Sequence, residues 1–153
     1  TFNLAGLIHS HVIIYDRKLM ETYDAYIKSI GSPEVNLLGV TGMEAAFRNG
    51  EEWFENVKSL ICHNYNYMKL ELAKELDVVV TPLEGTYLSW LDLRNYVPEK
   101  ETASFIQNKC RLACDVGEWF SFTGHGFIRI NLATDTKNIR TAVESIVTNI
   151  KAL

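Results

Sequence analysis

The clearest pattern of apolar and polar positions covers residues 51–76 and predicts one long helix. Its apolar residues recur three and four positions apart, as they do along one face of a helix: Trp53, Val57, Leu60, Ile61, Tyr65, Met68 and Leu72. Glu51 and Glu52 in the first turn stabilise the positive end of the helix dipole. The same spacing returns after a helix cap at residues 134–136. It predicts a last helix with a core stripe of Ile139, Ala142, Val143, Ile146, Val147 and Ile150.

Between these two helices the pattern changes to the short apolar runs that are typical of strands. Four segments are predicted as strands: 78–80, 86–91, 113–116 and 126–133. A further helix is predicted over residues 99–112, with Phe105 and Ile106 on its inner side. The order helix, strands, helix, strands, helix predicts an α+β sandwich in which helices cover a small sheet.

The first fifty residues have a different pattern. Residues 8–15 are rich in β-branched side chains and predict a buried strand. Residues 17–30 predict a helix that ends at Gly31, with Pro33 two positions beyond it. Residues 35–48 predict a second helix. Because one strand cannot close a sheet, we expect its neighbouring strands to lie upstream of this chain.

An arginine stands among apolar residues in the predicted strand 126–133. Alternation along the strand places Phe127, Arg129 and Asn131 on one face and three aliphatic residues on the other. Burying an unpaired guanidinium is costly, and its planar fork suits bidentate binding of a carboxylate. We therefore expect either a protein Asp or Glu or a ligand carboxylate opposite Arg129.

Composition excludes several classes of function. The chain has 153 residues, of which 47% are hydrophobic and 22% are charged, as in an ordinary globular domain. A net charge of -4 without a basic block gives no support for nucleic-acid binding. No apolar run approaches the length of a membrane span, so we predict no membrane partner. Three cysteines without a disulfide-scaffold pattern predict reduced thiols and a cytoplasmic location.

Two pairs of potential ligands are interpreted as structural. His9 and His11 share a face of the predicted strand 8–15, but no further ligand stands at a fitting spacing, so we predict no metal site. Cys110 and Cys114 are four positions apart and are interpreted as buried or half-buried thiols.

Three motifs together carry a resemblance to a known family: TFNLAGL at 1–7, GTYLSWLD at 85–92 and GFIRINLA at 126–133. They resemble the fold-type I pyridoxal-phosphate enzymes, within the class I/II aminotransferase family, most closely the cystathionine β-lyase (MalY/PatB) group. The resemblance covers essentially the whole chain and implies the C-terminal part of such an enzyme. It implies that residues 1–50 are the end of the large cofactor domain with interdomain helices. Residues 51–153 would then form the small C-terminal domain, around a mostly antiparallel sheet.

The resemblance also implies roles for individual residues. In that family the lysine that forms the Schiff base with pyridoxal phosphate immediately precedes the Thr-Phe-Asn segment, so it is expected just before Thr1, outside this chain. Arg129 would bind the substrate α-carboxylate, Gly85 would lie where the backbone approaches the substrate, and Asn3 would lie near the cofactor. Without the lysine, we predict that the isolated chain is inactive and does not hold the cofactor alone.

The implied substrate class is an amino acid, and the implied reaction is a C–S β-lyase reaction. Such an enzyme eliminates pyruvate, ammonia and a thiol from cystathionine or a cysteine-like substrate. An aminotransferase is the first alternative, because it needs the same lysine and the same Arg129. A ligand-sensing aminotransferase-like domain of a regulator is the second. Family members are usually homodimers, and we expect self-association through residues 1–50. The loop 117–126 departs from the family pattern at Ser121 and Phe122, where a glycine is usual.

Overall fold

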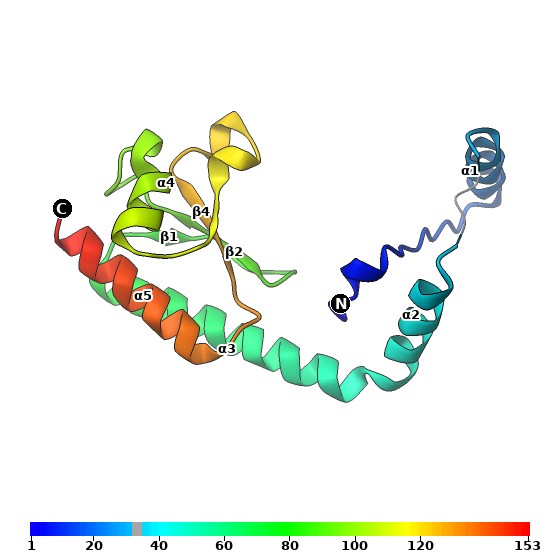
Figure 1. Cartoon of the computed structure of the whole chain (residues 1–153), viewed down its shortest axis with the longest axis horizontal. Helices are drawn as coiled ribbons and strands as arrows, with labels where there is room; N and C mark the ends of the chain where they lie inside the picture. The colour runs from blue at the N-terminus through cyan, green and yellow to red at the C-terminus, as the bar shows by residue number, and fades with distance from the viewer. Residues whose placement is uncertain (32–34) are drawn as a thin grey trace. The chain divides into compact units, whose positions relative to one another are not determined.

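A computed structural model of the chain describes residues 1–31 and 35–153 (Figure 1). Pro33, expected just beyond the first helix, lies outside the described residues. The chain divides into two compact units, Thr1–Glu55 and Asn56–Leu153, and each unit is described on its own. No helix in the described ranges combines the length and the apolar character that crossing a membrane requires.

The N-terminal unit consists of helices and irregular segments. It contains the short 3₁₀-helix η1 (Ala5–Leu7), α1 (Arg17–Ser29), α2 (Leu37–Asn49) and the first turn of α3 (Glu51–Glu75). The Asp16 side chain caps α1 by accepting a hydrogen bond from the Leu19 amide at 2.7 Å, and Asn36 caps α2 in the same manner. These bounds confirm the two helices predicted from the sequence to within two residues.

The strand predicted over residues 8–15 is wrong for this chain. The segment has no regular secondary structure, and the side chains of Ile8, Ile13 and Tyr15 are 88%, 76% and 97% exposed. A strand gains its backbone hydrogen bonds from a neighbouring strand, and no described segment pairs with this one. The β-branched residues therefore remain without the partner that their propensity requires.

Two glycines let η1 and the irregular segment that follows it approach helix α2 closely. A Cβ atom on Gly39 would lie 2.8 Å from the Cβ atom of His9, and one on Gly42 would lie 2.8 Å from Cδ1 of Leu7. Such contacts are far closer than van der Waals packing allows, so larger residues would push the segment away from α2. The two glycines in α2 thus serve close packing.

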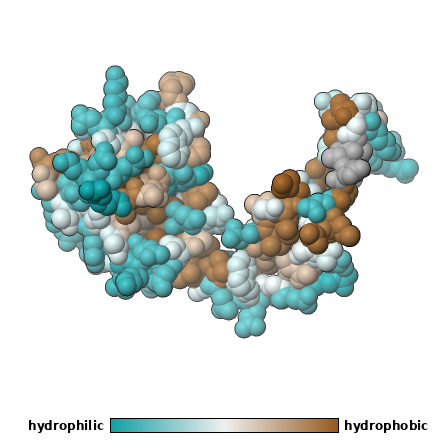
Figure 2. All heavy atoms as spheres, in the orientation of Figure 1, coloured by the Kyte–Doolittle hydropathy of each residue, from teal (hydrophilic) through white to brown (hydrophobic). Residues whose placement is uncertain are grey.

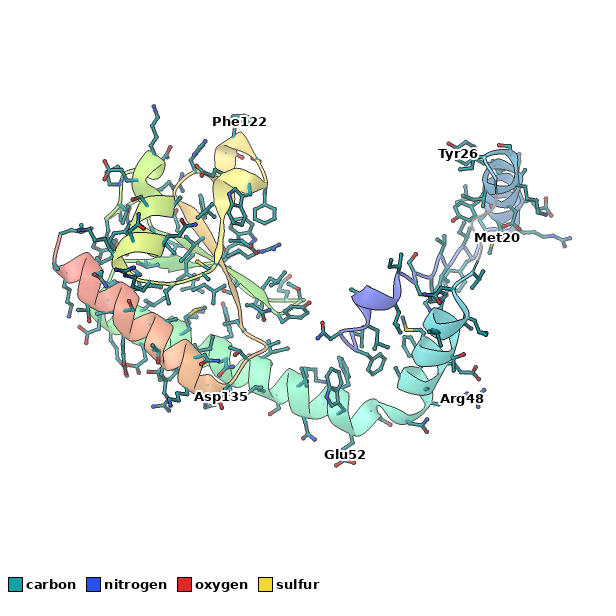
Figure 3. All side chains as sticks on the ribbon, viewed as in Figure 1. Met20, Tyr26, Arg48, Glu52, Phe122 and Asp135 are labelled. Carbon is teal, nitrogen blue, oxygen red and sulfur yellow. The ribbon has the colours of Figure 1, made fainter. Side chains whose placement is uncertain are left out.

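Much apolar surface of the N-terminal unit is uncovered. Figure 2 shows hydrophobic side chains gathered over α2, and Figure 3 shows Met20 and Tyr26 projecting from α1, a helix that has no buried residue. The exposed large apolar residues of this unit are Ile8, Val12, Ile13, Tyr15, Leu19, Tyr26, Ile30, Val35, Leu37, Leu38, Val40, Phe47 and Trp53. Apolar surface of this extent is typical of an interaction surface.

The C-terminal unit is built on a four-stranded antiparallel sheet with the order β1-β2-β4-β3. Its strands are β1 (Val79–Val80), β2 (Leu88–Asp92), β3 (Asp115–Val116) and β4 (Phe127–Asn131). Helices α3 and α5 (Thr136–Lys151) lie side by side along the sheet (Figure 1). This architecture confirms the predicted α+β sandwich with helices packed on a small, mostly antiparallel sheet.

The core of this unit lies between the sheet and the helices. Alternate residues of β2 and β4 are buried, and the pattern in β4 confirms the face assignment made from the period of two. The fully buried side chains are Met68, Leu72, Leu91, Leu93, Ile106, Ile128, Leu132, Ile146, Asn64 and Ser89. The opposite face of β4, with Arg129, is left half-exposed for other contacts.

The helix predicted over residues 99–112 is interrupted. It consists of a 3₁₀ turn η2 (Glu99–Glu101), a short α4 (Thr102–Ser104) and a π-helical turn η3 (Phe105–Lys109). The Cys110 amide donates a hydrogen bond to the Phe105 carbonyl, five residues back, at 3.0 Å. This wider turn keeps Phe105 and Ile106 buried, as the sequence predicted.

Two of the three thiols of this unit, those of Cys110 and Cys114, are expected to react slowly in the native protein. Cys110 is 3% exposed, and burial raises the pKa of Cys110 and Cys114 to about 11. Because the thiolate is the nucleophile, only about one thousandth of each is reactive at about pH 8. We expect iodoacetamide to label the exposed Cys62 first. Cys110 and Cys114 should be labelled only after unfolding.

Counting labelled cysteines by mass spectrometry over time checks this expectation. A Cys62→Ser chain is the control and should stay almost unlabelled while it is folded. Rapid double labelling of that folded control chain would show that the two thiols are accessible and would contradict the burial assigned to them.

Candidate functional site

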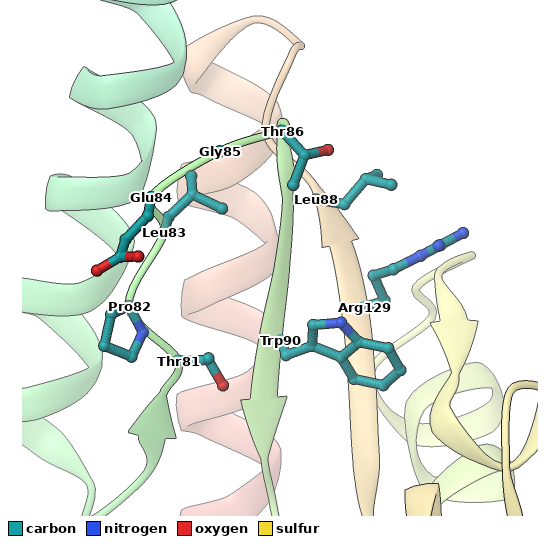
Figure 4. A pocket seen from close by; sticks show the side chains of 9 residues that line it. All are labelled: Thr81, Pro82, Leu83, Glu84, Gly85, Thr86, Leu88, Trp90 and Arg129. Carbon is teal, nitrogen blue, oxygen red and sulfur yellow. The ribbon is translucent and has the colours of Figure 1, made fainter. Parts of the chain in front are cut away.

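The structure places Arg129 and Gly85 in one pocket of the C-terminal unit. The pocket has a volume of about 430 Å³ and is seen from close by in Figure 4. Its lining residues are Thr81, Pro82, Leu83, Glu84, Gly85, Thr86, Leu88, Trp90 and Arg129. Asn3, the third residue singled out from the sequence, lies in the N-terminal unit, where it is exposed and has a left-handed φ of 55°.

Arg129 lies between two neighbouring strands. In the register of the sheet it stands opposite Trp90 of β2 on one side and opposite Asp115 of β3 on the other. Its Nε and Nη2 atoms both donate to Oδ2 of Asp115, at 2.9 and 2.5 Å. The sequence predicted a carboxylate opposite this arginine, and Asp115 supplies one. Within the described part of the chain, Nη1 donates no hydrogen bond.

One aromatic ring packs on the guanidinium group, and a second aromatic ring packs on the first. The Arg129 guanidinium carbon lies 4.4 Å from the centre of the Phe120 ring, a cation–π geometry. The Phe120 ring in turn meets Trp90 edge to face, with a distance of 5.3 Å between centroids. Trp90 and Arg129 project from the same side of the sheet (Figure 4). The arginine side chain is thereby held by hydrogen bonds and by ring contacts.

The loop that carries Phe120 closes on itself through two glycines. A Cβ atom on Gly117 would lie 2.1 Å from the carbonyl oxygen of Gly124, and one on Gly124 would lie 2.2 Å from that of Gly117. Ser121, one of the two loop positions where the sequence departs from the pattern that it resembles, accepts a hydrogen bond from the Thr123 amide at 3.0 Å. This serine is the N-cap of the short turn η5 (Phe122–Gly124), and its side chain stabilises the bend of the chain without a glycine.

Replacing Gly124 by alanine is expected to destabilise the C-terminal unit by about 2 kcal/mol, because the two backbones must separate to admit the methyl group. Urea unfolding measures the change in the free energy of unfolding. Gly6→Ala is the control, since a Cβ atom at Gly6 would meet no atom within 4 Å among the described residues. Equal stability of the two variants would mean that the loop does not need this contact.

The turn at the mouth of the pocket combines an uncrowded glycine with an unusual backbone. Thr86 has a φ of 63°, in a region that β-branched residues seldom occupy. A Cβ atom on Gly85 would meet no described atom within 4 Å. Packing within the described residues therefore does not demand a glycine at position 85.

Sequence reasoning missed Asp115 and Phe120, the two partners of Arg129. Asp115 was recognised only as part of a short strand, and the order of strands in an antiparallel sheet is not readable from local periodicity. Phe120 sits in a loop, where no repeating pattern exists. Among the described residues, no three or more His, Cys, Asp or Glu side chains lie close enough together to hold a metal ion.

Comparisons with known proteins agree in sequence and in fold. No family model matches the chain. The chain is 29% identical over 148 residues to the protein named cystathionine β-lyase PatB of Bacillus subtilis strain 168, a match to 95% of this chain and 38% of that protein. The chain thus spans about two fifths of the length of the curated relatives it matches.

Two solved structures have the same fold over almost the whole chain. The pyridoxal-phosphate-bound putative aminotransferase of Clostridium difficile 630 matches with a TM-score of 0.85 and 30% identity, over 98% of this chain and 39% of that one. The pyridoxal-phosphate-bound C–S lyase of Staphylococcus hominis, in complex with the inhibitor L-cycloserine, matches with a TM-score of 0.83 and 29% identity, over the same shares.

Proposed function

We propose that this chain supplies the substrate-carboxylate site of an enzyme that acts on amino acids. Its sequence and fold are those of the C-terminal part of the fold-type I pyridoxal-phosphate enzymes. Arg129 would bind the α-carboxylate, and the backbone at Gly85 would approach the substrate. The observation that carries this proposal is the pocket that contains both residues, with an arginine edge that has no described protein partner. The longer protein containing this chain is called the parent enzyme below.

A C–S β-lyase reaction is the activity we assign to the parent enzyme. The curated relative PatB is named a cystathionine β-lyase, and one matching structure is a C–S lyase. Another matching structure is called a putative aminotransferase, so amino transfer is the alternative. Binding of the substrate carboxylate by Arg129 serves both reactions, because either one requires an amino acid held in a fixed orientation.

The pocket of this chain does not by itself fit pyridoxal phosphate. Covalent attachment of this cofactor requires a lysine, and none of the nine residues that line the described pocket is a lysine. We therefore assign the cofactor to residues of the parent enzyme outside this chain. Asn3 would lie near the cofactor, as the motif around it suggests.

The two units would take different positions in the parent enzyme. We assign residues 1–50 to the end of the cofactor domain and the interdomain helices, and residues 51–153 to the small C-terminal domain. The uncovered apolar side chains of the N-terminal unit support contacts with the rest of the cofactor domain and with a second subunit of a homodimer. A cytoplasmic location fits the three unpaired cysteines.

The parent enzyme is expected to release pyruvate and a thiol from cystathionine, whereas the isolated chain should release neither. Pyruvate is measured by a coupled dehydrogenase assay and the thiol by a colorimetric reagent. Amino transfer that depends on an added keto acid, without pyruvate release, would favour the aminotransferase instead. Turnover by the purified isolated chain would overturn the assignment of the cofactor to residues outside it.

A further inference from the structure

The contacts of Arg129 divide its guanidinium group into an occupied edge and an open edge. Arginine has five N–H donors in a fixed plane. Asp115 accepts one hydrogen bond from Nε and one from Nη2, which together form the side edge of the group. The end edge, formed by Nη1 and the second hydrogen of Nη2, has no partner among the residues that the structure describes. That end edge has the spacing of donors that matches a carboxylate.

We propose that Asp115 is a positioning residue, which holds Arg129 by its side edge so that the end edge faces an amino-acid carboxylate. This inference rests on the proposed function and deepens it. Asp115 is well placed for the role because it comes from β3, directly opposite Arg129 in the sheet register. The backbone of the sheet therefore fixes the distance between the two side chains.

Asp115 binds the side edge of the guanidinium group, and a different residue orients the plane of the group. The Phe120 ring covers one face of the group at 4.4 Å. Trp90 supports that ring at 5.3 Å, from the strand on the other side of β4. An arginine with its rotamer and its plane both fixed loses little further entropy when it binds a ligand. Asp115 and Phe120 together thus prepare the group for a planar, bidentate ligand.

A comparable arginine lies outside the pocket, in the turn that follows β2. Arg94 donates from Nε and Nη2 to Asp92 at 2.9 and 2.6 Å, and it lies 4.6 Å from the centre of the Phe127 ring. None of these three residues lines the pocket at Arg129. Asp92→Asn is therefore the control for Asp115→Asn, because it removes an equivalent carboxylate from the same sheet.

The test compares two ligands that differ only in the carboxylate. L-alanine and ethylamine are titrated into the cofactor-loaded parent enzyme, and the dissociation constant of each is read from the change in cofactor absorbance. We expect Asp115→Asn to raise the Kd of L-alanine by about tenfold, which is the effect of weakening one charge-assisted hydrogen bond. The Kd of ethylamine should stay within about twofold of its original value, a difference too small to count as a lost interaction. Asp92→Asn should leave both constants unchanged.

The outcomes separate this inference from the proposed function. If Arg129→Lys leaves the Kd of L-alanine unchanged, Arg129 does not bind the carboxylate and both proposals fall. If Arg129→Lys weakens L-alanine but Asp115→Asn behaves like Asp92→Asn, only the positioning role is overturned. Tighter binding of L-alanine by Asp115→Asn would overturn it as well, because Asp115 would then compete with the ligand.

A second variant keeps the test decisive if Asp115→Asn does not fold. Asp115→Glu retains the charge but moves the carboxylate by one methylene group, so the two hydrogen bonds to Arg129 cannot both keep their geometry. We expect it to raise the Kd of L-alanine severalfold while ethylamine binding is retained. An unchanged Kd of L-alanine in this variant would overturn the positioning role.

Discussion

Replacing Arg129 by alanine is expected to lower kcat/KM of the parent enzyme for its amino-acid substrate by about a thousandfold. In the proposed role of Arg129, this change removes two charge-assisted hydrogen bonds to the substrate carboxylate, each contributing about 2 kcal/mol. Initial-rate kinetics over a range of substrate concentrations, with release of keto acid as the readout, measure the effect. Arg129→Lys should recover only part of the loss, because an ammonium group cannot bind both carboxylate oxygens in one plane.

Arg94→Ala is the control for this prediction. Arg94 also has a carboxylate partner and a ring contact on strands of this sheet, Asp92 of β2 and Phe127 of β4, but it lies outside the pocket. If Arg129 only paired with Asp115 for stability, both variants would lower the thermal midpoint by similar amounts and leave kcat/KM of the folded protein close to its original value. That pattern would refute a substrate-binding role for Arg129.

The environment of Arg129 was partly predictable from the sequence. The period of two in residues 126–133 predicted which side chains of this strand are buried, and β4 confirms it. The cost of leaving a guanidinium group unpaired predicted a carboxylate nearby, and Asp115 is that group. Which carboxylate it would be was not predictable, because β3 pairs with β4 through a long-range register that local patterns do not contain.

Errors in the remaining elements have physical causes of two kinds. Residues 8–15 have the composition of a strand, but a strand also needs a neighbour, and the described residues provide none. Residues 99–112 have a helical pattern, but the turn over Phe105–Lys109 is wider than an α-helical turn. Periodicity indicates which residues face a core, whereas the pattern of backbone hydrogen bonds along the helix also depends on how the side chains pack in that core.

The core stripe of α3 contains a polar residue that hydrophobic periodicity passes over. Asn64 stands three positions after Ile61 and four before Met68, and it is completely buried. Its Nδ2 atom donates to the carbonyl oxygens of Leu132 and Thr134, each at 2.9 Å. Its Oδ1 atom accepts a hydrogen bond at 2.8 Å from the hydroxyl group of Thr136, the first residue of α5. One side chain thus joins α3 to the connection between β4 and α5.

Replacing Asn64 by leucine is therefore expected to destabilise the C-terminal unit by about 4 kcal/mol, although leucine has a similar size and is apolar. The substitution leaves the buried carbonyl group of Leu132 without its partner, and also the part-buried carbonyl group of Thr134 and hydroxyl group of Thr136. An unsatisfied buried group costs about 1–3 kcal/mol, and the two part-buried groups are expected at the low end of that range. Urea unfolding of the chain, followed by circular dichroism, gives the free energy of unfolding.

Asn66→Leu is the matched control, because Asn66 lies two positions away on the exposed face of the same helix. Its free energy of unfolding should change by less than about 0.5 kcal/mol. Because both variants make the same chemical change in the same helix, the difference between their free energies of unfolding isolates the three hydrogen bonds of Asn64 from helix propensity. If Asn64→Leu proved as stable as Asn66→Leu, the connection between β4 and α5 would be held by apolar packing alone. The position of Arg129, on the face of β4 opposite the core, would then not depend on Asn64.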